Sequence, residues 1–201
     1  MPTAITPSSS DPTLATYSSP IGRLTLAARG GALAGLWVAG QRFFGSPYAI
    51  DEAVACSALD LTSPDSRELV SAAAEWDEAD ALALRAAVSW LDGYFAGEAP
   101  SPVCVPLAPV GTDFQQQVWE AMDAIPHGAT RTYGQITATL RGAGVPASAQ
   151  AVGGAVGRNP LLIIRPCHRV VAASGPGGYA AGGAAKAWLL AHEAATASSA
   201  S

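Results

Sequence analysis

A proline-rich stretch divides this chain and limits what each part can fold into. Between positions 97 and 111 four residues are proline, and Glu98 is the single charged residue. Because proline has no N–H donor and a fixed φ, such a stretch excludes a helix and most sheet interiors. We therefore expect an extended linker at 97–111, a scaffold domain at 13–96 and a second domain at 112–193.

The composition excludes several classes of protein. Of the 201 residues, 49% are hydrophobic and 13% charged, which excludes wholesale disorder. Apolar runs of membrane-spanning length are interrupted by charge, Gly or Pro, and no signal peptide is visible, so we expect no membrane partner. Three widely spaced cysteines make no disulfide framework, which favours a reducing compartment, the cytoplasm. The polar ends at 1–12 and 194–201 predict a disordered arm and a disordered tail.

Charge is distributed unevenly between the two parts. The formal net charge is −5, which taken alone argues against a nucleic-acid partner. Residues 1–111 carry five arginines and twelve acidic residues, a net charge of −7, whereas residues 112–201 carry five arginines, one lysine and four acidic residues, a net charge of +2. The second domain is therefore mildly basic and remains compatible with DNA.

The first half reads as a structural scaffold. Residues 24–28 and 33–38 predict two strands joined by a Gly-Gly turn. Cys56 and Cys104 have no histidine beside them and are interpreted as inert apolar residues. An amphipathic helix ending near Gly97 is predicted from apolar residues at helical spacing, namely Leu82, Ala86, Trp90, Leu91 and Tyr94. Nothing in this half indicates catalysis.

The second half predicts a run of helices. One begins after Thr112 and places Phe114, Val118 and Met122 on a single stripe. Residues 132–140 and 147–157 predict two short helices separated by a Gly-containing turn. This is the outline of a helix-turn-helix, although any small helical pair shares it.

The second helix of this pair contains three glycines in eleven residues. Each glycine costs about 1 kcal/mol relative to alanine in a helix interior, so helix propensity does not account for them. One interpretation is close packing against another element of the fold. The other is an exposed face that must approach a surface closely, such as the DNA minor groove, which is only about 6 Å wide. Gln150 is its one long polar side chain, which argues against sequence-specific reading of the major groove.

Cys167 is the candidate nucleophile. Its neighbours Arg165, His168 and Arg169 are cationic or potentially cationic, and nearby positive charge lowers the pKa of a thiol. Arg165 and Cys167 share a face of an extended segment, so we expect Arg165 to contribute. The alternative is a buried structural cysteine. The adjacent Cys-His pair lacks zinc-ligand spacing, and no metal is predicted.

Several motifs of this chain resemble those of the O6-alkylguanine-DNA alkyltransferases, also called methylated-DNA–protein-cysteine methyltransferases. The most specific is PCHRVV at 166–171 behind GGAVGRNP at 153–160. Further similar segments are SPIG at 19–22, GLWVAGQR at 35–42, GTDFQ at 111–115, RTYG at 131–134 and WLLAHE at 188–193. The resemblance covers nearly the whole chain except the tails. It implies an α+β fold, with an N-terminal α/β domain built on a small antiparallel, RNase H-like sheet and a mainly helical C-terminal domain that carries a helix-turn-helix and an active-site cysteine loop.

The resemblance also implies a reaction. Members of the family move an alkyl group from O6 of guanine, or O4 of thymine, onto their own cysteine, once and without a cofactor. Cys167 would be the acceptor, His168 would take its proton through a water, and Glu193 would orient His168. Asn159 would be the hinge that ties the recognition helix to the cysteine loop. Tyr133 would crowd the target's 3′ phosphate and donate to the flipped guanine.

The resemblance further implies which surfaces meet the substrate. Minor-groove DNA contact is implied for Tyr133, Gln150, Ala151, Gly153, Arg158 and Arg169. The base pocket is implied to include Val156, Val170, Tyr179 and Ala180, with the N–H of Ala180 meeting O6. We expect a monomer that acts on double-stranded DNA in the cytoplasm, at a bacterial nucleoid, with modest affinity and a shallow salt dependence.

Two residues depart from the family pattern. Gln150 stands where an arginine is usual and lacks its charge, so we expect weaker base flipping or weaker DNA binding. Arg165 replaces a common aliphatic residue.

Three alternatives stay open at this point: an alkyltransferase-like protein that binds lesions with weak or no transfer, a sequence-specific regulator, and a cysteine hydrolase. The presence of Cys167 favours repair over the first, and the small-residue helix argues against the second. No oxyanion site is visible for the third.

Overall fold

A computed structural model describes residues 11–63 and 76–199 of the chain. Ten residues of the expected N-terminal arm therefore lie outside the described part. The helices and strands are, in chain order, β1 (Thr13–Ser19), β2 (Gly22–Arg29), β3 (Ala32–Val38), α1 (Glu52–Cys56), β4 (Leu59–Asp60), α3 (Glu78–Phe95), the 3-10 turn η1 (Pro102–Cys104), α4 (Asp113–Asp123), β5 (Arg131–Thr132), α5 (Tyr133–Gly142), α6 (Ala149–Gly157), the 3-10 turn η2 (Cys167–Arg169), β6 (Val170–Val171) and α7 (Gly183–Ser199).

The N-terminal domain is built on a four-stranded sheet with the strand order β3-β2-β1-β4. β1, β2 and β3 are antiparallel, whereas the two-residue β4 pairs with β1 in parallel, so the expected antiparallel sheet is mixed at one edge. The two predicted strands lie within β2 and β3. Gly30 and Gly31 turn between them with φ of +63° and +78°, a left-handed conformation that glycine adopts without steric cost.

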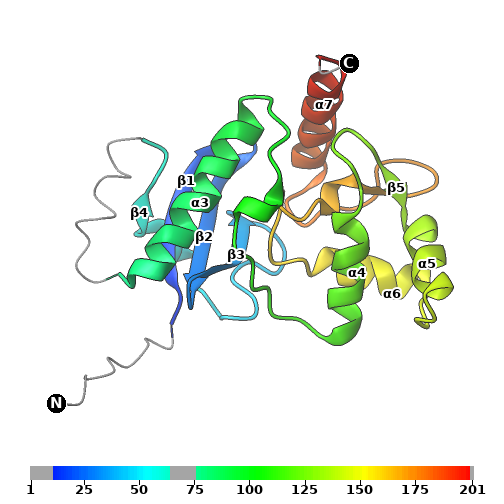
Figure 1. The fold of residues 1–201 in the computed structure, drawn as a ribbon, viewed down its shortest axis with the longest axis horizontal. Coiled ribbons are helices and arrows are strands. Elements are labelled where there is room, and N and C mark those ends of the chain that lie inside the picture. The colour runs from blue at the N-terminus through cyan, green and yellow to red at the C-terminus, as the bar shows by residue number, and fades with distance from the viewer. Residues whose placement is uncertain (1–10, 64–75, 200–201) are drawn as a thin grey trace.

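Helix α3 lies across one face of this sheet (Figure 1). Its N-terminus is capped by Asp77, whose carboxylate accepts hydrogen bonds from two backbone N–H groups of the first turn. The predicted buried stripe is correct at Leu91 and Tyr94 but wrong at Leu82, which is 56% exposed. The buried stripe instead runs through Leu84 and Val88, because the helix turns those residues toward the sheet.

The proline-rich segment is more structured than expected. Residues 102–104 form a single 3-10 turn with proline at its first position, where the missing N–H costs nothing. Farther along, the N–H of Leu33 in β3 donates to Pro106 O at 2.7 Å, and the N–H of Ala108 donates to Leu33 O at 2.9 Å. The linker therefore runs along the edge of the sheet. Cys56 and Cys104 are both exposed free thiols rather than packed apolar residues.

Strand β3 also pairs with the C-terminal domain. The N–H of Leu36 donates to Pro160 O at 2.7 Å, and the N–H of Leu162 donates to Leu36 O at 3.1 Å. One cluster of buried hydrophobic residues includes side chains of both domains. The segment that leads to Cys167 is thus fixed to the scaffold, so the two domains share one core.

The C-terminal domain consists mainly of helices α4, α5, α6 and α7, which lie at the opposite side of the molecule from β4 (Figure 1). The predicted helix pair is present as α5 and α6, with Thr132 and Ser148 as their N-caps. The predicted disordered tail is wrong up to residue 199, because α7 continues that far, and residues 200–201 lie outside the described part. The helix continues into the tail because alanine favours helical structure and because Oγ1 of Thr196 forms a 2.8 Å hydrogen bond with Nε2 of His127.

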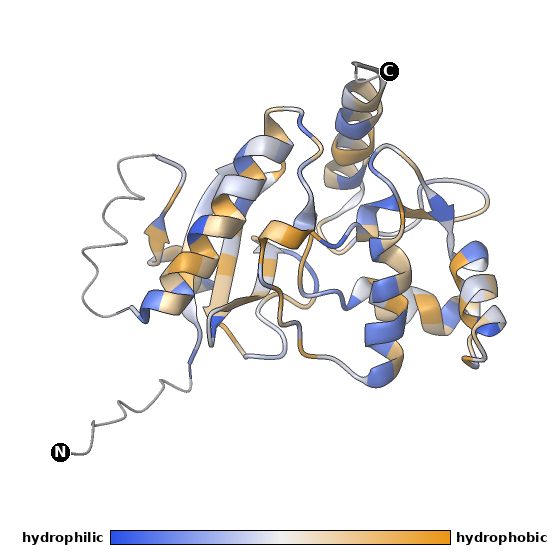
Figure 2. Cartoon of the chain, viewed as in Figure 1, coloured by the Kyte–Doolittle hydropathy of each residue, from blue (hydrophilic) through white to orange (hydrophobic). Residues whose placement is uncertain are grey.

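Hydrophobic and hydrophilic residues alternate along α3 and α4 (Figure 2), as expected for helices with one buried face. In the described part of the chain no helix combines the length and hydropathy needed to cross a membrane.

Candidate active site and DNA-binding surface

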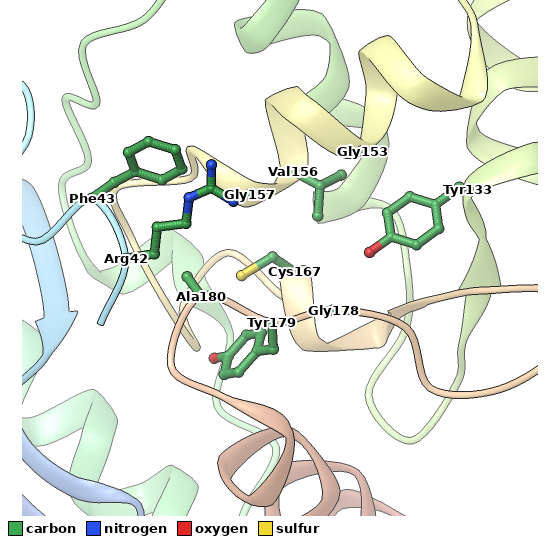
Figure 3. A pocket seen from close by; sticks show the side chains of 10 residues that line it. All are labelled: Arg42, Phe43, Tyr133, Gly153, Val156, Gly157, Cys167, Gly178, Tyr179 and Ala180. Carbon is green, nitrogen blue, oxygen red and sulfur yellow. The ribbon is translucent and has the colours of Figure 1, made fainter. Parts of the chain in front are cut away.

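Cys167 lines a cavity of about 230 Å³ to which both domains contribute. The side chain is only 3% exposed, so this cavity is its route to a substrate. In Figure 3 its sulfur points into the space between α6 and the loop at 178–180, and the hydroxyl of Tyr133 points into the same space. The lining residues are Arg42, Phe43, Tyr133, Gly153, Val156, Gly157, Cys167, Gly178, Tyr179 and Ala180.

Asn159 holds the loop that carries the cysteine. Its side-chain amide donates to Leu161 O at 3.2 Å, to Arg165 O at 3.0 Å and to the Sγ of Cys167 at 3.2 Å. Its Oδ1 accepts from the N–H of Leu161 at 3.0 Å. Between these contacts Ile163 has a φ of +68°, which is strained for a β-branched residue. Asn159 therefore joins the end of α6 to the cysteine loop through hydrogen bonds at both ends.

His168 follows the cysteine and is fully buried. Its Nε2 lies 2.6 Å from Oε1 of Glu193. Because a carboxylate only accepts, Nε2 carries the proton and Nδ1 is left as the basic nitrogen. Burial lowers the pKa of His168, although hydrogen bonding to Glu193 opposes the shift. The imidazole is thus held neutral and able to accept a proton at Nδ1.

Glu193 accepts hydrogen bonds from four residues. Oε1 receives the hydroxyl of Tyr94 at 2.9 Å, Nε2 of His168, and Nη2 of Arg169 at 2.9 Å. Oε2 receives the N–H of Gly128 at 3.1 Å and Nε of Arg169 at 2.8 Å. Burial alone would raise the pKa of Glu193, but the bonds and charges of His168 and Arg169 hold it well below the usual range. The carboxylate is therefore a fixed negative charge.

This arrangement corrects the sequence interpretation of the neighbouring arginines. Arg165 turns away from the cysteine, with its Nε 3.3 Å from Asp123 Oδ2 and its guanidinium over the ring of Trp119. Arg169, expected to contact DNA, is 11% exposed and bound to Glu193 and to Ile125 O. Arg169 has acceptors for its donors, whereas Nε and Nη1 of Arg165 are buried without a hydrogen-bond partner among the described residues.

The pKa of Cys167 is accordingly not lowered. Burial raises it to about 11 in the resting protein, against smaller opposing effects of the Asn159 hydrogen bond and the charge of Lys186. The expectation that flanking arginines lower the pKa of the thiol is wrong. The resting nucleophile is a thiol, so it needs a base to become a thiolate.

Lys186 is a residue of the site that the sequence interpretation missed. It is fully buried on α7, and its Nζ donates to Val170 O at 2.5 Å and to Gly178 O at 3.2 Å. It thereby ties the strand that follows the cysteine to the loop at 178–180, and it is the cation whose charge acts on Cys167. One signal was available, since Lys186 is the single lysine in a chain that otherwise uses arginine.

The helix-turn-helix adjoins the cavity. β5 pairs in parallel with β6, which brings the N-terminus of α5, and with it Tyr133, beside the cysteine loop. Burial raises the pKa of Tyr133, and the charge of Cys167 adds to this, so its hydroxyl stays protonated. On α6, Gln150 and Ala151 are exposed, as is Arg158 at its C-terminal cap.

The glycines of α6 are not required by internal packing. A Cβ added to Gly153 or Gly154 would meet no atom closer than 3.7 Å, and one added to Gly157 would meet nothing within 4 Å. The first of the two sequence interpretations, close packing within the fold, therefore does not explain them. The second interpretation, a surface that approaches this helix closely, stays a prediction.

Three of the four residues expected in the base pocket line the cavity. Val156, Tyr179 and Ala180 line the cavity, whereas Val170 is buried beside it and contributes its carbonyl to Lys186. The hydroxyl of Tyr179 is buried without a hydrogen-bond partner among the described residues. In the part of the chain that the structure covers, no group of three or more His, Cys, Asp or Glu is placed to hold a metal ion.

A helix-turn-helix pair above a buried Cys–His–Glu arrangement defines a DNA-binding domain that carries a nucleophilic cysteine. Residues 113–195 match the family described as 6-O-methylguanine DNA methyltransferase, DNA binding domain. The chain is 41% identical over 160 residues to the methylated-DNA–protein-cysteine methyltransferase of Mycobacterium bovis, which covers 80% of this chain and 78% of that protein. The Mycolicibacterium paratuberculosis relative is 38% identical over 179 residues, which are 89% of this chain and 90% of that protein. The Methanosarcina acetivorans relative is 50% identical over 107 residues, which are 53% of this chain and 66% of that protein.

Solved structures show the same relationship. The O6-methylguanine methyltransferase of Mycobacterium tuberculosis superposes with a TM-score of 0.63 at 38% identity, covering 92% of this chain and 94% of that one. The M. tuberculosis OGT in complex with DNA superposes with a TM-score of 0.67 at 38% identity, covering 91% of this chain and 93% of that one. The chain therefore belongs to the methylated-DNA–protein-cysteine methyltransferase family, and the expected α+β fold is confirmed.

Proposed function

We propose that this protein repairs alkylated DNA by direct reversal, transferring the alkyl group from O6 of guanine, or O4 of thymine, to Cys167. The observation that carries the proposal is the position of the cysteine. Its sulfur faces a cavity large enough for more than solvent, next to a buried proton acceptor and beside a helix whose three glycines are not required by internal packing.

The reaction follows from these groups. The target nucleotide leaves the base stack and enters the cavity, because O6 is not open to in-line attack inside the duplex. The thiol proton passes to Nδ1 of His168 through a water, while Glu193 stabilises the imidazolium that forms. The sulfur then attacks the alkyl carbon. An S–C bond forms, the C–O6 bond breaks, and its electron pair goes to O6.

The departing guanine needs a proton. Tyr133 remains protonated and points into the cavity, so it is placed to donate to the base as charge develops there. The N–H of Ala180, a residue that lines the cavity, would meet O6. His168 then gives up the proton it took and Tyr133 regains the one it donated, so the products are guanine and an S-alkyl cysteine, and the proton count balances without a cofactor.

A thioether does not leave again under mild conditions, so each molecule acts once. We propose that the protein approaches DNA as a monomer, with α6 in the minor groove and Gln150, Ala151, Gly153 and Arg158 on the contact face. The reaction would take place in the cytoplasm, at the nucleoid of a bacterial cell.

A turnover experiment tests this proposal. With a molar excess of duplex DNA that carries O6-methylguanine, we expect loss of one lesion per protein molecule, after which the reaction stops. Continued turnover past one equivalent, or no loss of O6-methylguanine at all, would contradict single transfer to the protein.

A further inference from the structure

The rim of the active-site cavity contains a cluster from both domains. Arg42 and Phe43 lie in the loop after β3, and Arg158 caps α6. The guanidinium carbon of Arg42 lies 4.7 Å from the centroid of the Phe43 ring, and that of Arg158 lies 5.0 Å from the same centroid. Both distances are within the range of a cation–π contact, so one ring braces two positive charges.

The loop that carries this cluster is fixed in place. Phe43 has a φ of +64°, an uncommon conformation for a residue with a bulky side chain. The backbone N–H of Arg42 donates to Ala180 O at 3.2 Å, which ties the loop to the segment over the cavity. Figure 3 shows the guanidinium of Arg42 beside Gly157, at the end of α6, with Phe43 next to it.

The two charges lack an internal counterion. In the described part of the chain no carboxylate forms an ion pair with Arg42 or Arg158. Arg158 has one long contact to a helix carbonyl, Gly154 O at 3.5 Å, and both side chains are exposed. Arg165 and Arg169, by contrast, are paired with carboxylates. Two like charges held on one ring repel each other, and an anion placed between them would relieve the repulsion.

We propose that Arg42 and Arg158, braced by Phe43, bind a phosphate of the DNA strand next to the flipped nucleotide. The inference rests on the proposed function, because it requires DNA at the mouth of the cavity. Guanidinium groups suit this role, since their planar donors match phosphate oxygens. The N-terminal domain, whose net charge is −7 by sequence, would then contribute a DNA contact through this one loop.

Salt-dependent binding tests the proposal. Arg42→Met and Arg158→Met remove a charge from an exposed side chain, and methionine keeps the backbone N–H at position 42. Arg29→Met is the matched control, because Arg29 is exposed in the same domain and lies over one ring, that of Tyr48, away from the cavity. Affinity for a duplex with one O6-methylguanine would be measured by fluorescence anisotropy over a range of salt concentrations, in a Cys167→Ser background that prevents transfer.

We expect each rim variant to bind more weakly and to reduce the slope of log K against log[salt] by about 0.9, the value for one lost phosphate contact, and the control to change neither. An unchanged slope in both rim variants would overturn the proposal.

A second measurement separates this inference from the proposed function. With Cys167 restored, each variant would react with the free base O6-benzylguanine, which has no phosphate. We expect each rim variant to lose a larger share of its transfer rate on duplex DNA than of its S-benzylation rate with the free base. Equal slowing on the free base and on DNA would show that the arginines act on the pocket, which overturns the phosphate role. Absence of benzylation in the wild-type protein would count against the proposed function instead.

Discussion

The hydroxyl of Tyr94 donates a 2.9 Å hydrogen bond to Oε1 of Glu193, so a helix of the N-terminal domain reaches the carboxylate that holds His168. Tyr94 is fully buried, and burial together with Glu193 keeps its pKa well above the usual range, so it acts only as a donor. The scaffold domain, which by sequence showed no sign of catalysis, therefore contributes a positioning residue.

Tyr94→Phe removes this donor and keeps the ring. The charge of Glu193 then falls more strongly on His168, which raises the pKa of the imidazole. We expect the acidic limb of the pH profile of methyl transfer to move to higher pH. Tyr17→Phe is the control, since Tyr17 bonds Asp92 in the same domain, and it should leave the profile in place.

The same variant should be less stable by about 1.5–3 kcal/mol at neutral pH, the usual value of a hydrogen bond to a charged group. Glu193 has a lowered pKa in the folded state, so the stability it contributes is present above its unfolded pKa and is lost as the pH falls toward the folded value. Urea denaturation should therefore show a difference that is constant from pH 7 to pH 5, because the carboxylate of Glu193 stays ionised in the folded protein across this range. A difference that shrinks within this range would contradict the assignment.

Lys186→Met removes the buried cation that acts on Cys167. We expect the pH midpoint of thiol alkylation to rise by on the order of one unit. Arg165→Ile is the control, because Arg165 is paired with Asp123 and turned away, and its midpoint should stay at the wild-type value. A shift in the Arg165 variant without one in the Lys186 variant would reverse the assignment.

Asp123 gives a separate pH signal. Burial raises its pKa from 3.8 to about 6, although Arg165 opposes the shift. A carboxyl with a raised folded pKa costs stability as it ionises, so this contribution falls as the pH rises from about 4 to 6. We expect Asp123→Asn to remove that part of the decline when unfolding free energies are compared from pH 4 to 7. Parallel curves for the two proteins would refute it.

Gln150→Arg restores the usual charge on the recognition helix. We expect faster single-turnover repair of O6-methylguanine in duplex DNA and no change with free O6-benzylguanine, because only DNA needs base flipping. Ala149→Arg adds the same charge one exposed position away and should help less. Equal rates for Gln150→Arg and the parent on duplex DNA would show that glutamine suffices.

Most of the fold could be predicted from local sequence patterns. The strands around Gly30, the α5–α6 pair and the position of Cys167 all follow from spacing and turn residues that lie close together in the chain. The stripe on α3 was misplaced at Leu82, because the sheet that selects the buried face is distant in sequence. The helical end of α7 was missed, because a polar composition resembles disorder until its packing is seen.

The electrostatics of the site could not be read from the chain. Arg165 and Arg169 adjoin Cys167 in sequence, yet their acceptors, Asp123 and Glu193, come from α4 and α7. Lys186 and Tyr94 reach the site from other helices, far from Cys167 in the sequence. Partners brought together by tertiary folding decide which charges a thiol experiences.

The most direct test is the mass of the tryptic peptide that contains Cys167 after incubation with O6-methylguanine DNA. We expect one added methyl on that peptide, located on Cys167 by fragmentation, and none on the peptides with Cys56 or Cys104. An unmodified Cys167 peptide, with the lesion still in the DNA or the methyl on another residue, would contradict the assignment of this cysteine as the acceptor.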